Sequence, residues 1–182
     1  KKLSYVLSAR VSPLTYEYRA VRKFLPHMLG GLDNFNAKVG DLYGKLHFQV
    51  NEKSALDASF LGSVDSYGYD TQGDSHDEMS WDNLLGILRY RYDGEVTSFN
   101  LTASANRYGS RQKQDKTYRG EVSHYSLRSS LMEYGLKAGL QHRFLDERLV
   151  IGEGLNLRYG RFAPGQIGED TRISNTMLST LW

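Results

Sequence analysis

The chain contains no cysteine, so disulfide bonds and thiol chemistry are excluded. Proline is scarce, at three residues in 182, so few positions prevent a strand from pairing. No apolar run approaches the roughly 18 residues that a spanning helix needs, and the mean hydropathy of −0.53 excludes a helical membrane protein. An excess of one charge is also absent. The 23 basic and 21 acidic residues give a net charge of +2, which does not indicate nucleic acid as a partner.

The sequence is instead rich in segments in which apolar and polar residues alternate. In 42–50 and in 56–64, an apolar residue or glycine stands at every even position, and polar residues occupy most odd positions. Further segments of this kind are 3–11, 84–92, 99–105, 132–140, 149–159 and, more weakly, 172–182. Because successive side chains of a strand point to opposite faces, each segment predicts a strand with one apolar face. We therefore predict an all-β fold, an antiparallel up-and-down meander of about eight strands of roughly 10 to 14 residues, longer than the usual 5 or 6.

The connections between these segments are of two kinds, which alternate along the chain. Tight turns are predicted near 51–54, 93–94 and 145–148, and the Asp-Gly pair at 93–94 is a strong hairpin signal. Long external loops are predicted near 13–40, 68–80, 109–125 and 163–170. The first loop contains a helix-like segment, RAVRKFLPHML, that Pro26 interrupts. This alternation gathers the tight turns on one rim and the long loops on the other, as in outer-membrane barrels.

The apolar face of such a sheet contacts either lipid or a protein core. The polar face consists mostly of Ser, Thr, Asn, Lys and Arg, which suits a water-filled lumen. Aromatic residues stand near the ends of the apolar face, where membrane barrels carry aromatic girdles: Tyr67, Tyr69, Tyr90, Tyr92 and Phe144. We therefore favour a transmembrane β-barrel in a bacterial outer membrane. A soluble antiparallel sandwich that serves as a binding module is the plainer alternative.

Three stretches of the sequence carry a family resemblance. They are LSYVLSARVSPL at 3–14, LYGKLHFQVNEKSALDASFLGSVDSYGY at 42–69 and WDNLLGILRYRY at 81–92. In this order and with these loop lengths, they resemble barrel strands of TonB-dependent outer-membrane receptors of the Bacteroidetes type. The resemblance spans most of the chain.

The resemblance implies a receptor barrel of about 22 strands closed by a plug domain. Such receptors import a nutrient with energy that TonB transmits through the plug region, and in some branches a surface lipoprotein caps the barrel. The substrate class (siderophore, oligosaccharide or peptide) stays open. Residues 1–182 would then be one partial transmembrane β-barrel domain of such a receptor. Because the chain has no plug-like segment and begins with Lys1 without a signal peptide, we expect a processed or cut piece. The alternative is a complete small barrel of about eight strands, filled by its own side chains, that acts as an adhesin or a structural or binding protein.

Candidate ligand-binding residues are the aromatic residues at the external strand ends. They are Tyr67, Tyr69, Trp81 and Tyr108. Aromatic rings suit sugars or other flat ligands. Anchoring at the membrane interface is the alternative role of these rings.

Enzymatic and metal chemistry find little support in the sequence. The five histidines are scattered without metal-ligand spacing, and the His124 and Ser126 pair stands in a serine-rich stretch. The acidic residues of one predicted loop do not fit the spacing of an EF-hand: Asp70, Asp74, Asp77, Glu78 and Asp82. We expect a protein that is not an enzyme and that has no cofactor and no metal site.

Overall fold

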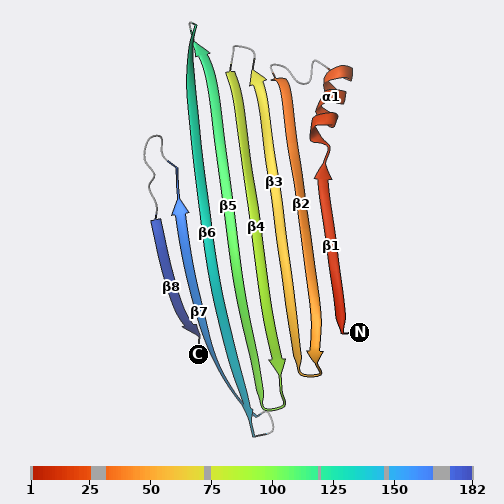
Figure 1. Ribbon diagram of the computed structural model, residues 1–182, viewed down its shortest axis with the longest axis vertical. Coiled ribbons are helices and arrows are strands. Elements are labelled where there is room, and N and C mark those ends of the chain that lie inside the picture. The colour runs from red at the N-terminus through yellow and green to blue at the C-terminus, as the bar shows by residue number, and fades with distance from the viewer. Residues whose placement is uncertain are drawn as a thin grey trace.

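One antiparallel sheet and one helix make up the computed structural model, which describes residues 2–25, 32–71, 75–118, 120–145, 148–165 and 173–181. The strands are β1 (Leu3–Ser12), β2 (Leu32–Asn51), β3 (Ser54–Thr71), β4 (Ser75–Asp93), β5 (Thr97–Tyr118), β6 (Glu121–Phe144), β7 (Leu149–Ala163) and β8 (Ile173–Leu181). The helix α1 (Leu14–Phe24) follows β1. Each strand pairs with its neighbours in sequence, in the order β1 to β8 (Figure 1). The predicted all-β meander is confirmed.

The sheet is open in the described part of the chain. Strands β1 and β8 form its two edges, and no pairing joins them within the described ranges. The helix α1 continues beyond the end of β1 and lies beside β2 (Figure 1). None of the described helical residues forms a segment long and apolar enough to cross a membrane.

Several strands are longer than the alternation predicts, because two of the predicted external loops are strands. The range 68–80 belongs to the long β3–β4 hairpin, in which Thr71 pairs with Ser75. The range 109–125 belongs to the β5–β6 hairpin, in which Thr117 pairs with Val122. The pattern failed because both faces of these extensions carry polar residues, while the backbone ladder forms regardless of the side chains. The range 163–170 begins at the end of β7, and residues 166–172 lie outside the described residues.

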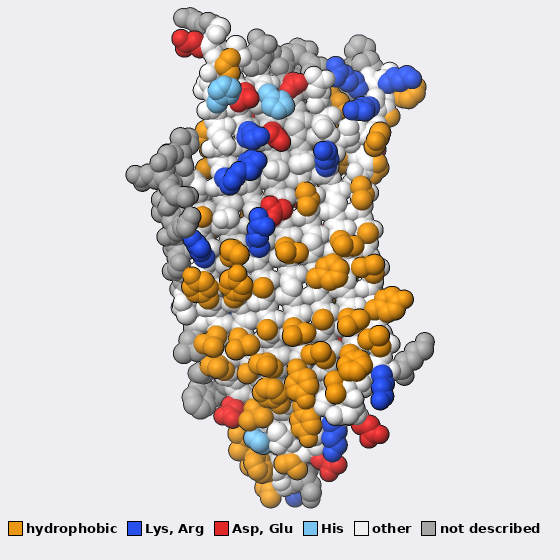
Figure 2. All heavy atoms as spheres, in the orientation of Figure 1, with side chains coloured by type: hydrophobic (Ala, Val, Ile, Leu, Met, Phe, Trp, Pro, Cys, Tyr) orange, Lys and Arg blue, Asp and Glu red, His pale blue; other side chains and the backbone are white. Residues whose placement is uncertain are grey.

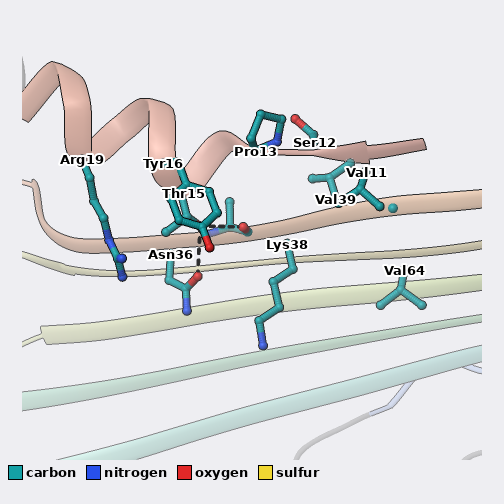
Figure 3. A pocket seen from close by; sticks show the side chains of 12 residues that line it. Val11, Ser12, Pro13, Thr15, Tyr16, Arg19, Asn36, Lys38, Val39 and Val64 are labelled. Carbon is teal, nitrogen blue, oxygen red and sulfur yellow. Dashed lines mark hydrogen bonds between the residues drawn. The ribbon is translucent and has the colours of Figure 1, made fainter. Parts of the chain in front are cut away.

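The connection at 13–40 contains a helix, as predicted, but the helix begins earlier than the predicted segment, and β2 begins within the range. Pro26 lies outside the described residues. Thr15 of α1 attaches the helix to β2: its Oγ1 accepts the Ala37 N–H at 2.8 Å and lies 2.6 Å from the Ala37 carbonyl oxygen (Figure 3). The pairing of β1 with β2 stops at Ser12 and Val39. Thr15 therefore binds the backbone N–H and carbonyl of Ala37, which a longer β1 would otherwise have bound.

A hydrophobic belt crosses one face of the sheet, which we call the outer face. Cross-strand pairs align its side chains in rows, such as Leu46 with Ala58 and Leu88. The larger members of the belt are Leu3, Tyr5, Leu7, Leu42, Leu46, Phe48, Leu56, Phe60, Leu84, Leu88, Tyr90, Tyr92, Phe99, Leu101, Tyr134, Leu136, Leu140, Leu155, Leu157 and Tyr159. Figure 2 shows hydrophobic side chains gathered over the lower half of the sheet.

The belt is exposed and has the height of a membrane. Leu84 and Leu88, in the middle of the sheet, are 55% and 49% exposed. At a rise of about 3.4 Å per residue, Leu84 and Tyr92 lie about 27 Å apart along β4, close to the apolar band of about 25 Å on membrane barrels. The opposite, inner face carries polar and charged groups at this level, including the His47–Asp57–Arg91 cluster, with contacts of 2.8 and 2.9 Å.

Candidate functional site

The two faces of the sheet exchange character above the hydrophobic belt. There the outer face becomes charged, through residues such as Lys38, Asp82, Arg107, Arg111, Lys113 and Arg128. At the same height the inner face becomes apolar, through residues such as Phe35, Val39, Tyr67, Met79, Trp81, Leu127 and Leu131. The strands continue without interruption, so the exchange results from the order of residues and not from a break in the sheet.

An aromatic cavity of about 310 Å³ opens on this apolar part of the inner face. It is lined by Leu14, Phe35, Ala37, Val39, Asp65, Ser66, Tyr67, Tyr69 and Trp81. The rings of Tyr67 and Trp81 meet edge to face, with centroids 5.6 Å apart. The Tyr67 hydroxyl lies 3.2 Å from the Met79 sulfur, which fixes the orientation of the phenol ring. The cavity therefore offers aromatic faces to an apolar or flat group.

The helix α1 closes one side of this aromatic cavity. Leu14 lines the cavity, and Tyr18 packs against Phe35 with ring centroids 5.0 Å apart. Thr15 holds the first turn of the helix on β2 through Ala37, which is 7% exposed. The side of the cavity that a continuation of β1 could have formed is thus supplied by a helix.

Three of the four candidate ligand-binding residues come together here. Tyr67, Tyr69 and Trp81 line the cavity. Tyr108 lies on the same face, opposite Asn83 on β4 and Leu131 on β6, but does not line the cavity.

The structure corrects the face on which two of the tyrosines lie. The aromatic-girdle prediction places Tyr67 and Tyr69 at the end of the apolar face. The register aligns Tyr67 with Ala37 and Met79, and Tyr69 with Asp77, on the inner face. Their odd positions already lie opposite the even apolar positions of 56–64, because the prediction followed the aromatic character of the two residues and not the alternation.

The sequence prediction did not include the other six lining residues, and four of them lie in the range 13–40, which was assigned to a loop: Leu14, Phe35, Ala37 and Val39. The signal was present: Phe35, Ala37 and Val39 alternate with Asn36 and Lys38, in the opposite phase to 42–50. A change of phase within one strand predicts that the face in contact with apolar groups has changed.

A second cavity of about 520 Å³ lies on the outer side of the junction between α1 and β2. It is lined in part by Tyr16, Arg19, Lys38 and Val64. The side chains of Arg19 and Lys38 extend to the same side in Figure 3. This cavity is more polar in character than the aromatic cavity, because two cations border it.

An ionic cluster stands at the tip of the β3–β4 hairpin, beyond the belt. His76 Nδ1 lies 2.6 Å from Asp70 Oδ1, and Asn34 Nδ2 donates to Asp70 Oδ2 at 2.7 Å. The hydrogen bond to Asp70 raises the pKa of His76 above its ordinary value of 6.5. The hydrogen bonds from His76 and Asn34 lower the pKa of Asp70 below its ordinary value of 3.8. The two groups therefore stabilise each other's charged forms.

The remaining acidic residues of this hairpin are distributed over both faces. Asp77 pairs opposite Tyr69 on the inner face, while Glu78 and Asp82 lie on the outer face. Asp74 lies outside the described residues. Within the described part of the chain, no three His, Asp or Glu side chains are grouped closely enough to hold a metal ion.

Comparison with known proteins bears on the fold. No protein-family profile matches the sequence, and no curated protein matches it significantly. Among solved structures, the chain is similar to BauA, the ferric preacinetobactin receptor from Acinetobacter baumannii, with a TM-score of 0.50 and 11% identity. The match covers 80% of this chain and 27% of the receptor, so the chain spans about a quarter of that protein's length. At this identity the likeness concerns the fold alone, a long-stranded meander like a part of a receptor barrel.

Proposed function

We propose that the chain is a part of the barrel wall of a bacterial outer-membrane receptor that imports a nutrient with energy from TonB. The observation that carries this proposal is the exchange of faces above the belt. At the level of the belt, the outer face is apolar and the inner face polar, which suits lipid outside and a wet lumen inside. Above the belt, the charged outer face suits water and the apolar inner face suits a ligand or another part of the receptor.

The open edges favour a larger barrel over a small closed one. Strands β1 and β8 each pair on one side only within the described residues. Lipid cannot satisfy the backbone groups of a free edge, so an open sheet in a membrane requires further strands. The likeness to a receptor of which this chain covers about a quarter is consistent with such strands.

The aromatic cavity is the proposed contact for the nutrient at the external mouth. Tyr67, Tyr69 and Trp81 offer ring faces, and Asp65 adds one carboxylate at the cavity wall. Aromatic faces bind sugar rings and flat aromatic groups, which oligosaccharides and many siderophores carry. BauA is a receptor for ferric preacinetobactin, and a siderophore is accordingly one substrate class to examine first. The same proposal includes the Bacteroidetes type of receptor. Its expected partners are a plug domain, TonB and a capping lipoprotein.

The test is to determine the mass and the peptide map of the native protein in its own membrane. We expect an outer-membrane protein several times larger than the 20.7 kDa of this chain, with a plug region before these strands. A native product of 20.7 kDa whose electrophoretic mobility changes on heating would instead identify a small closed barrel and would rule out the import mechanism. A product that fractionates with soluble proteins would rule out both barrels.

A further inference from the structure

A hollow of about 190 Å³ lies on the outer face directly above the hydrophobic belt. Three of its lining residues are Arg107, Arg111 and Arg128. Gly109 lies between Arg107 and Arg111 on β5, and the Asp82 carboxylate extends over it, since a Cβ at Gly109 would lie only 2.8 Å from Asp82 Oδ1. Asp82 is the single carboxylate among the described lining residues, so the hollow has a net charge of +2. We call it the arginine hollow.

Two of these arginines face each other without a carboxylate partner among the described residues. Arg111 and Arg128 are directly opposite in the β5–β6 ladder. Asp82 lies 4.0 Å from Arg107, and no described carboxylate forms an ion pair with Arg111 or Arg128. Like charges directly opposite destabilise a sheet, so an anion bound between them would relieve the repulsion.

Cations farther from the belt on the same face have carboxylate partners. Lys113 lies 3.1 Å from Glu78, and His124 lies 2.8 Å from Asp115. Lys38 aligns in the same row as Arg111, through Ser66 and Ser80, and likewise has no ion pair among the described residues. Among the described residues, Lys38, Arg111 and Arg128 thus form a row of cations without an ion pair, nearer to the belt than the paired Lys113 and His124.

We infer that the arginine hollow binds the phosphate group of a lipid headgroup in the outer leaflet. Gly109 lies two residues beyond Arg107, about 7 Å along the strand, and a headgroup layer extends about 5 to 7 Å beyond the hydrocarbon. Guanidinium groups bind phosphate through two parallel hydrogen bonds, and the Ser80 and Ser130 hydroxyls at the hollow can donate further ones. The carboxylate of Asp82 opposes the anion and orients Arg107. This inference rests on the proposed membrane placement.

The test measures lipid binding to the intact protein in neutral detergent by native mass spectrometry. The probes are diphosphorylated lipid A, the same lipid without its phosphates, and inorganic phosphate. Each basic side chain contributes about fivefold at an anionic membrane surface, so Arg111→Gln with Arg128→Gln should weaken binding of the phosphorylated lipid about 30-fold. Lys113→Gln, on the same strand and face but paired with Glu78, should bind as the unmodified protein does.

A second variant separates binding from folding. Arg128→Glu places a carboxylate opposite Arg111, so it should strengthen the β5–β6 pairing while it abolishes selective binding of the phosphorylated lipid. Equal binding of the phosphorylated and dephosphorylated lipids, or unchanged binding in both variants, would overturn the inference. Binding of inorganic phosphate as tight as that of the lipid would overturn the assignment to a lipid. If heating does not change the electrophoretic mobility of the unmodified protein, as it does for an inserted barrel, the membrane placement is refuted, and the inference with it.

Discussion

At the scale of the residue, Leu46 and Lys45 are neighbours in β2 that lie on opposite faces of the sheet. Leu46 lies in the middle row of the belt, between Tyr5 and Ala58, and Lys45 lies on the inner face. We expect Leu46→Arg to lower the free energy of unfolding from vesicles by about 2 to 4 kcal/mol, because a charge at mid-bilayer faces lipid. Lys45→Leu should change it much less. Urea unfolding in vesicles measures both, and equal effects would mean that the belt does not face lipid.

Substitution of Trp81 tests most directly whether the aromatic cavity binds the nutrient. Truncation of a central aromatic contact typically costs about 2 kcal/mol or more in binding, so Trp81→Ala should weaken nutrient uptake about 30-fold. Tyr90→Ala, which removes an aromatic residue of similar size from the outer face, should leave uptake unchanged. Growth of a strain that depends on the intact receptor gives the readout. Unchanged growth of the Trp81 variant at limiting nutrient would remove the aromatic cavity as a ligand contact.

The Asp70–His76 pair predicts a pH window for the tip of the β3–β4 hairpin. His76 has a raised pKa, so its stabilisation is complete below pH 6.5 and is lost as the pH rises through its folded-state pKa. Asp70 has a lowered pKa, so its stabilisation is present above pH 3.8 and is lost as the pH falls through its folded-state pKa. Protection of the tip amides from hydrogen exchange, corrected for the intrinsic rate, should be greatest between these limits.

A variant pair checks this pH window. Asp70→Asn removes the charge that favours protonated His76, so the loss of protection at rising pH should shift downward or disappear. His142→Gln, at the other end of β6 beside Thr97, should keep the window unchanged. A window that persists in Asp70→Asn would assign the pH dependence to other groups.

At the scale of the element, α1 replaces a strand at the edge of β2. Thr15→Val leaves the Ala37 N–H and carbonyl without the hydroxyl that they bind, which should cost about 1 to 3 kcal/mol locally. Faster hydrogen exchange at the Ala37 amide and faster proteolysis within α1 would report this loss. Thr15→Ser keeps the hydroxyl and should restore both. If Thr15→Val matches the unmodified protein, the helix is held by its ring contact between Tyr18 and Phe35 instead.

At the scale of the whole molecule, the absence of cysteine permits a direct test of closure. Engineered cysteines at Tyr5 and Leu46, which pair across β1 and β2, should form a disulfide and serve as the control. Cysteines in β1 at Leu7 and in β8 at Thr176 should remain free, because the two edge strands do not pair within the described sheet. Neighbouring positions on each edge should be scanned as well. A disulfide between β1 and β8 in the native membrane would establish a closed eight-stranded barrel.

The sequence by itself determined the meander and the hydrophobic belt. In 42–50 and 56–64, the alternation follows from a geometric property of the extended backbone, which sends successive side chains to opposite faces whatever the rest of the chain does. The number of strands, their antiparallel order and the aromatic ring of Trp81 near an external end could all be predicted for this reason. The length of the strands could not be predicted. The hairpin extensions of β5 and β6 carry no apolar face, and backbone hydrogen bonding between strands does not depend on the polarity of the side chains.

Only the tertiary structure decided what lies side by side above the belt. The phase of alternation gives a face to each strand, but the register between strands decides that Arg111 meets Arg128 and that Tyr67 meets Trp81. The docking of α1 on Ala37 depends on where β1 stops, which no local pattern encodes. The aromatic cavity and the arginine hollow are therefore products of cross-strand alignment. They arise from contacts between residues far apart in the chain, whose spacing along the sequence carries no information about their distance in space.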